Sequence, residues 1–246
     1  MEVEDELIQI ANVTTPRIIK VIGVGGGGGN AVGQMYRDNI PEVRYLVANT
    51  DKKALDDNIV PDHLQLGPGL GAGGDPERGA ALANECIDQI NAALDDETKM
   101  VFVTAGMGGG TGTGASPVIA HAAREKGILT VGIVTIPFLF EREKQIDKAL
   151  DGLDKLSKEV DAMLVINNQR LCDIYSDLSI INAFKRADET LSTAVSSITE
   201  IISMHGRVNL DFQDVNTTLR NGGVAVMSTG YAEGENRVTR AINDAL

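Results

Sequence analysis

The chain alternates short, continuously apolar runs with longer segments in which apolar residues recur every three or four positions. The apolar runs predict buried strands at residues 17–24, 43–48, 63–66, 100–103, 128–136 and 162–166. Strands that are apolar throughout and alternate with helices are typical of a parallel sheet covered by helices on both faces. We therefore predict an α/β fold with a Rossmann-like parallel sheet.

The segments with helical periodicity predict helices at residues 31–38, 75–94, 117–124 and 141–160. The longest predicted helix covers residues 180–204, and the part from 184 to 204 would span roughly 30 Å. Beyond it, Asp211 starts a further predicted helix, residues 224–231 resemble a strand, and residues 233–246 resemble a helix. That strand has no later partner, so we expect the chain to stop inside a second α+β domain.

Glycine-rich or polar segments follow the predicted strands, at 25–30, 49–51, 67–74, 104–117, 137–141 and 168. Because the carboxyl ends of parallel strands meet at one edge of a sheet, these segments predict a single site built from many loops. Residues 104–120 contain no charged side chain. An anion held there would be bound by backbone N–H groups, by the hydroxyls of Thr111 and Thr113, and by a metal ion.

The composition argues against several classes of protein. The net charge is −13 with a pI near 4.6, which disfavours binding of nucleic acid or of an anionic membrane through the general surface. No apolar run approaches the ~18–20 residues of a membrane span, so no direct membrane insertion is expected. The isolated Cys86 and Cys172 favour a reducing, cytoplasmic location, and the scattered histidines predict no side-chain metal site.

One alternative is a cytosolic NAD-dependent oxidoreductase. Gly23, Gly25 and Gly28 match a dinucleotide-binding fingerprint, and Asp51 stands where a ribose-binding acid would lie. However, a run of five glycines satisfies almost any glycine template, and a second glycine loop follows a separate strand. The Walker pattern GxxxxGK[ST] is absent, and neither loop contains Lys or Arg. These features favour a triphosphate surrounded by backbone amides from two or three loops.

The segment 108–114, with the sequence GGGTGTG, resembles the signature loop of the tubulin/FtsZ superfamily. The flanking residues 105–107, the glycines before Asn30, and residues 49–51, 71–77 and 209–214 resemble its bacterial cell-division branch in the same order. The resemblance implies a self-assembling GTPase that binds GTP or GDP with Mg²⁺ and forms a head-to-tail homopolymer. It also implies cell-division adaptor proteins as partners and a cytoplasmic ring at midcell as the location.

The resemblance also implies the site residues. The phosphates and nucleoside would meet Gly25, Gly26, Gly27 and Asn30, then Ala72, Gly73 and Gly74, then Gly106, Gly109, Gly110, Thr111 and Gly112. Glu141 and Asn168 would bind the ribose and base side. Phe184 would lie on the guanine ring, and Asp188 would accept from its N1 and N2 hydrogens. Asn209, Asp211 and Asp214 would be catalytic.

Several of these residues have simpler interpretations. Phe184 lies on the apolar face of a predicted helix, where a phenylalanine is usually part of the core. Asp188 would ordinarily be a solvent-exposed acid on the same helix. Asp211 would ordinarily be the N-cap of the next helix, with Asp214 favourably placed in the first turn. Glu189, next to Asp188, is an alternative reader of the base. The superfamily branch commonly has an arginine four residues after the ribose-side glutamate. Here that position is Gln145, and the nearby Arg142 and Lys144 are possible substitutes.

The resemblance divides the chain into a disordered tail (1–16), a GTP-binding domain (17–179), a central helix (180–204), and a catalytic loop with a truncated start of a C-terminal domain (205–246). If Phe184 and Asp188 touch guanine, Asp211 and Asp214 lie roughly 30–40 Å away, beyond the far end of the helix. Orienting a water molecule needs contacts of about 3 Å, so these acids would act on the nucleotide of a head-to-tail neighbour.

A related alternative is a nucleotide-binding scaffold that assembles without hydrolysis. Without the rest of the second domain, we expect nucleotide binding to survive and filament formation to be weak or lost.

Overall fold

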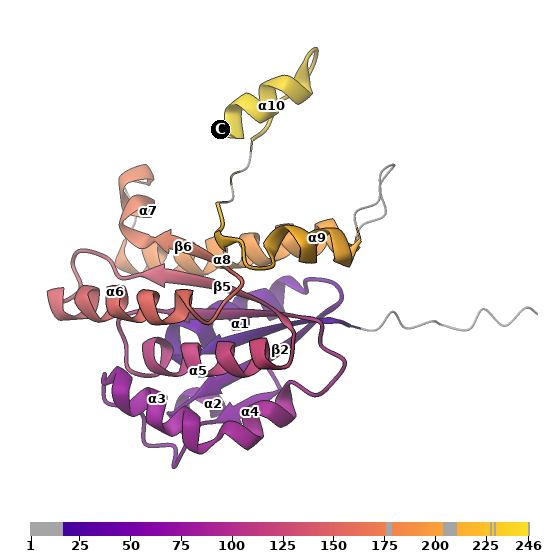
Figure 1. Ribbon diagram of the computed structural model, residues 1–246. Coiled ribbons are helices and arrows are strands. Elements are labelled where there is room, and N and C mark those ends of the chain that lie inside the picture. Colours follow the sequence, from indigo (N-terminus) through magenta and orange to yellow (C-terminus); the bar gives the residue numbers. More distant parts are fainter. Residues whose placement is uncertain (1–16, 176–178, 204–210, 227, 229, 246) are drawn as a thin grey trace, which may run out of the picture.

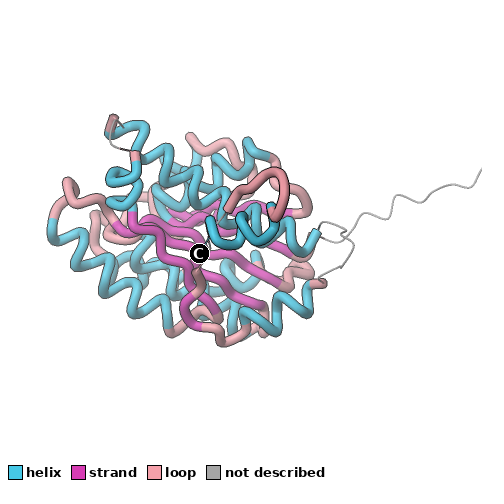
Figure 2. The backbone as a smooth tube through the Cα atoms, turned by 90° about the horizontal axis from the view of Figure 1, so that it is seen from above, coloured by secondary structure: helices cyan, strands magenta, loops and turns pink. Residues whose placement is uncertain are grey.

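The computed structural model describes residues 17–175, 179–203, 211–226, 228 and 230–245. Its centre is a parallel sheet in the order β3-β2-β1-β4-β5-β6-β7 (Figures 1 and 2). The strands are β1 (Ile19–Val24), β2 (Val43–Asn49), β3 (His63–Gln65), β4 (Met100–Gly106), β5 (Leu129–Ile136), β6 (Ala162–Asn167) and β7 (Gly223–Val224). The predicted α/β fold is therefore confirmed.

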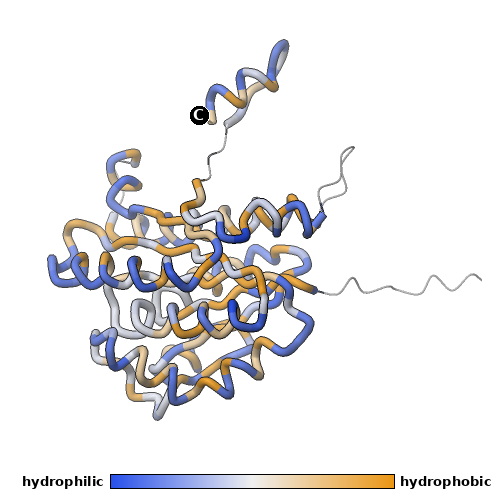
Figure 3. The backbone as a smooth tube through the Cα atoms, in the orientation of Figure 1, coloured by the Kyte–Doolittle hydropathy of each residue, from blue (hydrophilic) through white to orange (hydrophobic). Residues whose placement is uncertain are grey.

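Helices cover both faces of the sheet, because the central strands are apolar on both sides (Figure 3). The helices are α1 (Gly25–Asp38), α2 (Lys52–Asp56), α3 (Pro76–Glu85), α4 (Ile87–Ala93), α5 (Thr111–Glu125), α6 (Glu143–Ser157), α7 (Asn168–Ile174), α8 (Ile180–Ser203), α9 (Phe212–Leu219) and α10 (Arg237–Ala245). One core contains side chains of α4, α5 and α6, such as Ile90, Ile119 and Leu156. The core on the opposite face contains side chains of α1 and α8, such as Met35 and Leu191.

Two predicted helices have different boundaries in the structure. Helix α1 begins at Gly25 rather than at residue 31, so the glycine run is helical. A Cβ atom on Gly28 would lie 2.3 Å from the carbonyl oxygen of Thr104, so only glycine lets α1 approach β4 this closely. Packing therefore outweighs the low helix propensity of glycine. The predicted helix at 75–94 is broken at Cys86 into α3 and α4, and the Cys86 sulfur accepts a hydrogen bond from the N–H of Gly67.

The short helices α2 and α7 lie in segments for which the sequence pattern predicted no element. Each begins directly after a strand, and each is capped by a polar side chain at the strand end: Asp51 for α2 and Asn167 for α7. Their length, five and seven residues, is too short for periodicity to identify them. They turn the chain away from the sheet edge immediately after the polar segments that were assigned to the site.

The strand predicted at residues 224–231 is much shorter in the structure. Strand β7 has two residues and pairs in parallel with the start of β6, through Ala162 opposite Gly223 and Met163 opposite Val224. The strand was expected to have no later partner, and in the structure it pairs with an earlier strand, β6. The pairing occupies backbone groups at the edge of β6 that would otherwise be open. The division of the chain into domains stays a prediction, and residues 1–16 and Asn209 lie outside the described residues.

None of the helices in the described ranges is both long and apolar enough to cross a membrane.

Candidate functional site

The loops at the carboxyl edge of the sheet surround a cavity of about 270 Å³, which we call the edge cavity. Its lining comes from the ends of β4 and β5, from the loops that follow them, and from helices α1, α6, α7 and α8. The lining residues are Gly27, Asn30, Gly106, Met107, Gly108, Gly109, Thr135, Pro137, Glu141, Gln145, Asn168, Phe184, Ala187, Asp188 and Leu191. Of the predicted phosphate-side residues, Gly27, Asn30, Gly106 and Gly109 line this cavity, together with the predicted base-side residues Glu141, Asn168, Phe184 and Asp188.

Two of the glycine loops touch each other through their backbones. Gly25 has a φ of +74°, and a Cβ atom there would lie 2.8 Å from the nitrogen of Gly112. A Cβ atom on Gly27 would lie 3.2 Å from the Cα of Gly106. Within the described residues, neither α1 nor α5 has a side-chain hydrogen bond capping its first turn. Two positive helix ends with free N–H groups therefore converge beside the cavity, which is the arrangement that binds anions.

A third loop, residues 66–75, lies against these two. The N–H of Gly71 donates to the carbonyl oxygen of Thr50 at 2.8 Å, and the hydroxyls of Thr50 and Thr111 are 2.5 Å apart. A Cβ atom on Gly110 would lie 2.8 Å from the backbone nitrogen of Asp75, so these segments also touch through their backbones. Further along the loop, Gly73 and Gly74 have positive φ values and open space around them. Their exposed backbone is the part of this loop that is available to a ligand.

The hydroxyl of Thr113 has a different role from the one expected. It accepts a hydrogen bond from the N–H of Gly108 at 2.8 Å, and Thr113 is buried. The hydroxyl therefore fixes the turn between β4 and α5 instead of facing an anion. Thr111, two residues earlier, faces Thr50 at the start of the same helix.

Phe184 lies in a cluster of three aromatic rings at the mouth of the cavity. Its ring centre is 5.0 Å from that of Phe138 and 6.2 Å from that of Phe140, and both contacts are edge-to-face. Phe184 is 44% exposed, so it is not a core side chain. Phe138 and Phe140 are not among the predicted site residues. Their signal is a pair of aromatic residues directly after the long apolar strand β5, in a chain that is poor in aromatic residues.

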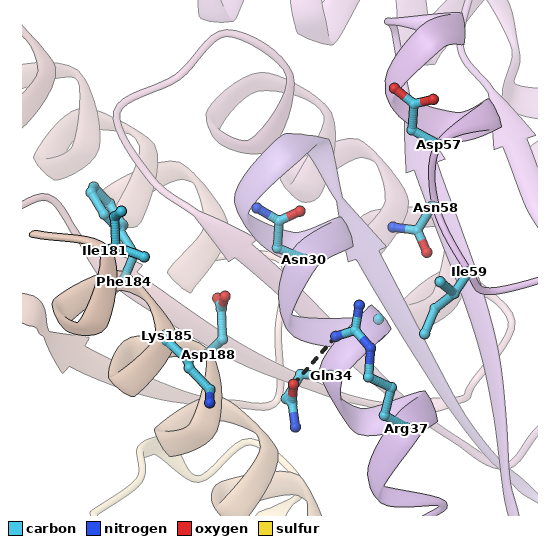
Figure 4. A pocket seen from close by; sticks show the side chains of 11 residues that line it. Asn30, Gln34, Arg37, Asp57, Asn58, Ile59, Ile181, Phe184, Lys185 and Asp188 are labelled. Carbon is cyan, nitrogen blue, oxygen red and sulfur yellow. Dashed lines mark hydrogen bonds between the residues drawn. The ribbon is translucent and has the colours of Figure 1, made fainter.

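Asp188 is half-buried on α8 and lines both the edge cavity and a neighbouring cavity (Figure 4). Burial raises the pKa of its carboxyl to about 7, with the charge of Arg37 opposing that rise and the charge of Glu189 adding to it. Glu189 instead pairs with Arg186 at 2.8 Å and lines neither cavity. The geometry therefore favours Asp188 over Glu189 as the acid that faces a bound ligand.

Two polar side chains complete the wall of the cavity between β5 and α7. Glu141 is held in place because one of its carboxylate oxygens accepts from the N–H of Phe138 at 3.0 Å. Asn168 is buried, and among the described residues its side-chain oxygen has no hydrogen-bond partner. Buried polar atoms are rarely left unpaired, so this oxygen is positioned to meet a donor on a ligand.

Gln145 lines the cavity, but its side-chain oxygen accepts from the N–H of Arg142 at 3.3 Å in a capping interaction at the start of α6. Neither Arg142 nor Lys144 lines the cavity. One turn further along α6, the Lys148 ammonium donates to the carbonyl oxygen of Gly74 at 2.6 Å. Lys148 is therefore the α6 cation that the structure places on the glycine loops, and the sequence analysis did not identify it.

Asp211 and Asp214 lie away from the cavity, at the start of α9. Asp211 accepts from the N–H of Asp214 at 3.0 Å, and Asp214 accepts from the N–H of Asp211 at 3.1 Å. Asp214 also lines a groove with Ile198 and Ile201 near the end of α8. From Phe184 to Ile201 the helix extends about 25 Å, so the cavity and the two acids lie toward opposite ends of α8.

Comparison with known proteins is consistent with this geometry. The model of the Tubulin/FtsZ family, GTPase domain, matches residues 18–176. The chain belongs to the tubulin/FtsZ family. It is 57% identical to the cell division protein FtsZ of Porphyromonas gingivalis, over 99% of this chain and 55% of that protein. It is 47% identical to the cell division protein FtsZ of Aquifex aeolicus, over 94% of this chain and 64% of that protein.

The chain therefore spans between about half and two thirds of the length of these curated relatives. Among solved structures, an empty FtsZ dimer from M. jannaschii matches with a TM-score of 0.86 and 38% identity, over 92% of this chain and 67% of that chain. A GTPγS-bound protofilament of CetZ2 from Haloferax volcanii matches with a TM-score of 0.73 and 28% identity, over 87% of this chain and 66% of that chain.

Within this family fold, the support for an NAD site is weak. The Asp51 carboxylate accepts from the N–H groups of Lys53 and Ala54, so it acts as the N-cap of α2. A Cβ atom on Gly23 would lie 2.4 Å from the carbonyl oxygen of Gly28, so that glycine serves the packing of β1 against α1. The features that resembled a dinucleotide fingerprint therefore have structural explanations.

Proposed function

We propose that this chain binds GTP and GDP in the edge cavity and hydrolyses GTP when it assembles head to tail with a second copy. One observation carries the proposal: the cavity and the acids Asp211 and Asp214 lie toward opposite ends of one long helix. About 25 Å of helix separates Phe184 at the cavity from Ile201 beside Asp214, so these acids cannot orient the water that attacks a phosphate bound in the same copy. The acids of one copy therefore act on the nucleotide of the next.

The phosphates would be held by the N–H groups at the start of α1 and α5 and by the exposed backbone of Gly73 and Gly74. The edge of Phe184 and its aromatic neighbours would border the base. Asp188 would accept from the N1 and N2 hydrogens of guanine, and adenine offers no matching pair of donors. The unpaired oxygen of Asn168 and the free oxygen of Glu141 would accept from the ribose and base side.

Mg²⁺ is expected to accompany the nucleotide. In the part of the chain that the structure describes, no group of three or more His, Cys, Asp or Glu side chains could hold a metal ion. The ion would therefore be held by phosphate oxygens, and it would supply the positive charge that the loops around residues 104–112 lack.

Hydrolysis would proceed by attack of water on the terminal phosphate. Asp211 and Asp214 of the neighbouring copy would polarise or orient that water, with Asn209 orienting the loop before them. Such a contact joins two different surfaces and does not close on itself, so it propagates into a filament. The names of the relatives support the same proposal, since they describe cell division proteins, a dimer and a protofilament.

The cellular role follows from those relatives. We propose a cytoplasmic filament at the division site, in a midcell ring that works with cell-division adaptor proteins. Binding of nucleic acid or direct insertion in a membrane is not part of this proposal.

The test measures GTP turnover per molecule against protein concentration in Mg²⁺. The rate per molecule should rise with concentration, and Asp214→Ala should abolish turnover while GTP stays bound. Gln213→Ala, an exposed neighbour on the same turn of α9, is the matched control and should behave as the wild type. A rate per molecule that does not depend on concentration would refute hydrolysis between copies.

A second candidate is a guanine-nucleotide scaffold that assembles without turnover. The mutual capping of Asp211 and Asp214 favours it, because each acid is already engaged by the other's N–H group. Equilibrium binding of GTP, GDP, ATP and NAD separates both of these candidates, which should prefer guanine nucleotides, from the oxidoreductase, which should prefer NAD. Turnover in Mg²⁺ then separates the GTPase from the scaffold.

A further inference from the structure

A second cavity of about 380 Å³ adjoins the edge cavity on the side of α1 (Figure 4). The two cavities share Asn30, Phe184 and Asp188. The remaining lining of the second cavity is Gly33, Gln34, Arg37, Asp57, Asn58, Ile59, Ile181 and Lys185. Asp188 therefore faces a ligand site on one side and a group of charged side chains on the other.

The ionisation of Asp188 matters for the proposed recognition of guanine. A carboxylate accepts from both the N1 and N2 hydrogens of the base, whereas a protonated carboxyl directs its own hydrogen at one of those donors. Burial opposes ionisation and raises the pKa of Asp188 to about 7. A nearby positive charge is therefore needed to keep the carboxylate available at neutral pH.

Arg37 on α1 is placed to supply that charge. Its guanidinium donates to the side-chain oxygen of Gln34 at 3.3 Å, which directs it along α1 at the wall of the second cavity (Figure 4). The adjacent acid, Asp38, has both oxygens engaged, by Gln34 at 2.8 Å and by Ser192 of α8 at 2.7 Å. Among the described residues, Arg37 has no carboxylate within ion-pair distance.

The other charged groups around Asp188 do not replace Arg37. Lys185 and Glu189 lie on the same helix, and they pair with each other at 3.9 Å. Asp57, from the segment after α2, and Glu141, from the segment after β5, line the cavities but are acids, so neither supplies a positive charge to Asp188. Arg37 is thus the cation that faces Asp188 from a different element.

We propose that Arg37 is a specificity-determining residue: its guanidinium, which shares the second cavity with Asp188, keeps the Asp188 carboxylate available to accept from guanine. Arg37 acts through Asp188 and does not itself contact the base. This inference rests on the proposed function, because it assigns Arg37 a part in recognising the guanine that the edge cavity is proposed to bind.

The experiment compares the dissociation constants of GTP and inosine triphosphate across a pH series from about 5.5 to 8.5. Inosine triphosphate lacks the 2-amino group, so the ratio of the two constants reports the contact between Asp188 and N2. Both nucleotides have the same phosphates, and phosphate titration therefore cancels from the ratio. In the wild type, the preference for GTP should be on the order of tenfold or more above pH 7 and should decline as Asp188 becomes protonated.

In Arg37→Gln, the decline should move to higher pH, and the preference for GTP at pH 7 should fall by roughly two- to threefold. At the upper end of the pH series the two proteins should converge. Arg37→Lys keeps the charge and should restore most of the wild-type profile. Lys53→Gln changes the net charge equally at an exposed position outside both cavities, and it should leave the profile unchanged.

An Arg37→Gln profile that superimposes on the wild type would overturn the inference. So would an equal loss of affinity for both nucleotides at every pH, because that result indicates a structural role. Failure of the wild type to bind GTP at all would instead remove the proposed function, and the inference with it. That outcome is recognised before any Arg37 variant is measured.

Discussion

Replacing Arg220 with alanine is expected to loosen α9 and β7 from the sheet while the part of the chain around the edge cavity stays folded. The attachment depends on Asp161, which is 1% exposed at the start of β6. Its carboxylate accepts from the N–H of Thr130 at 2.9 Å and from the N–H of Asn221 at 3.3 Å. Arg220 lies 3.5 Å from the same carboxylate and also donates to the carbonyl oxygen of Gly127 at 3.1 Å.

The expected magnitude follows from these contacts. Hydrogen bonds to charged groups contribute about 1.5–3 kcal/mol each, and one third of the Arg220 side chain is exposed, which reduces their value. We therefore expect a loss of about 2 kcal/mol in the free energy that holds α9 and β7 closed. This corresponds to a roughly thirtyfold increase in the open population. In the open form the Asp161 carboxylate still accepts from the N–H of Thr130, so the sheet itself should not unfold.

The assay is native-state hydrogen exchange, resolved by segment. Amides in residues 212–224 should exchange about thirtyfold faster in Arg220→Ala, while those of β1 and β4 keep their protection. Lys158→Ala is the matched control, because the Lys158 side chain makes an exposed pair with Asp154 on α6 and should contribute well under 1 kcal/mol. Unchanged exchange in residues 212–224 of Arg220→Ala would show that the ion pair does not hold this segment.

Three other predictions concern stability. Gly28→Ala should lower the free energy of unfolding, measured by thermal unfolding, by about 3 kcal/mol or more, because the new Cβ would lie 2.3 Å from a carbonyl oxygen of β4. Gly26→Ala is the control: a Cβ there meets open space, so the loss should be small. Burial acts to raise the pKa of the Asp96 carboxyl, but hydrogen bonds, first among them the one from Lys20, hold that pKa below its ordinary value. The ionised carboxylate therefore stabilises the fold only above that range, and Asp96→Asn should lose its destabilising effect as the pH falls below about 4. Leu191→Ala should lower the free energy of unfolding in urea by about 2–5 kcal/mol, because Leu191 is buried between α8 and the sheet.

The sheet could be predicted because its strands are buried on both faces. Such strands carry apolar residues on both faces, which identifies β1, β4 and β5 without any knowledge of their neighbours, although each contains isolated polar residues such as Lys20 and Thr104. The start of α1 could not be predicted, because helix propensity places glycines outside helices. Helix α1 includes these glycines because Gly28 lies against the backbone of β4, where no larger residue fits. That requirement belongs to the tertiary structure and leaves no local signal.

For the site, the glycine pattern located the loops, and the strand order placed them at one edge. Sequence spacing could not choose between Asp188 and Glu189, because neighbouring residues on a helix differ only by a rotation of about 100°. The choice depends on which of them faces α1. Likewise, the cation nearest Gly74 is Lys148 because α6 passes beside the loop. Neither the hydrophobic pattern nor a sequence motif predicts that contact.

The two ends of the site differ in chemistry, and this makes their contributions separable. The proposed phosphate side consists of backbone N–H groups and glycines whose charge state does not change with pH, so we expect its affinity to depend on the divalent cation that accompanies the phosphates. The base side contains Asp188, whose carboxyl has a pKa of about 7. Affinity for the guanine ring should therefore depend on pH near neutrality. Removing the cation should weaken GTP and inosine triphosphate equally, whereas lowering the pH should weaken GTP more. If both treatments changed the ratio of the two affinities, base and phosphate recognition would be coupled, and the assignment of Asp188 to the base alone would be wrong.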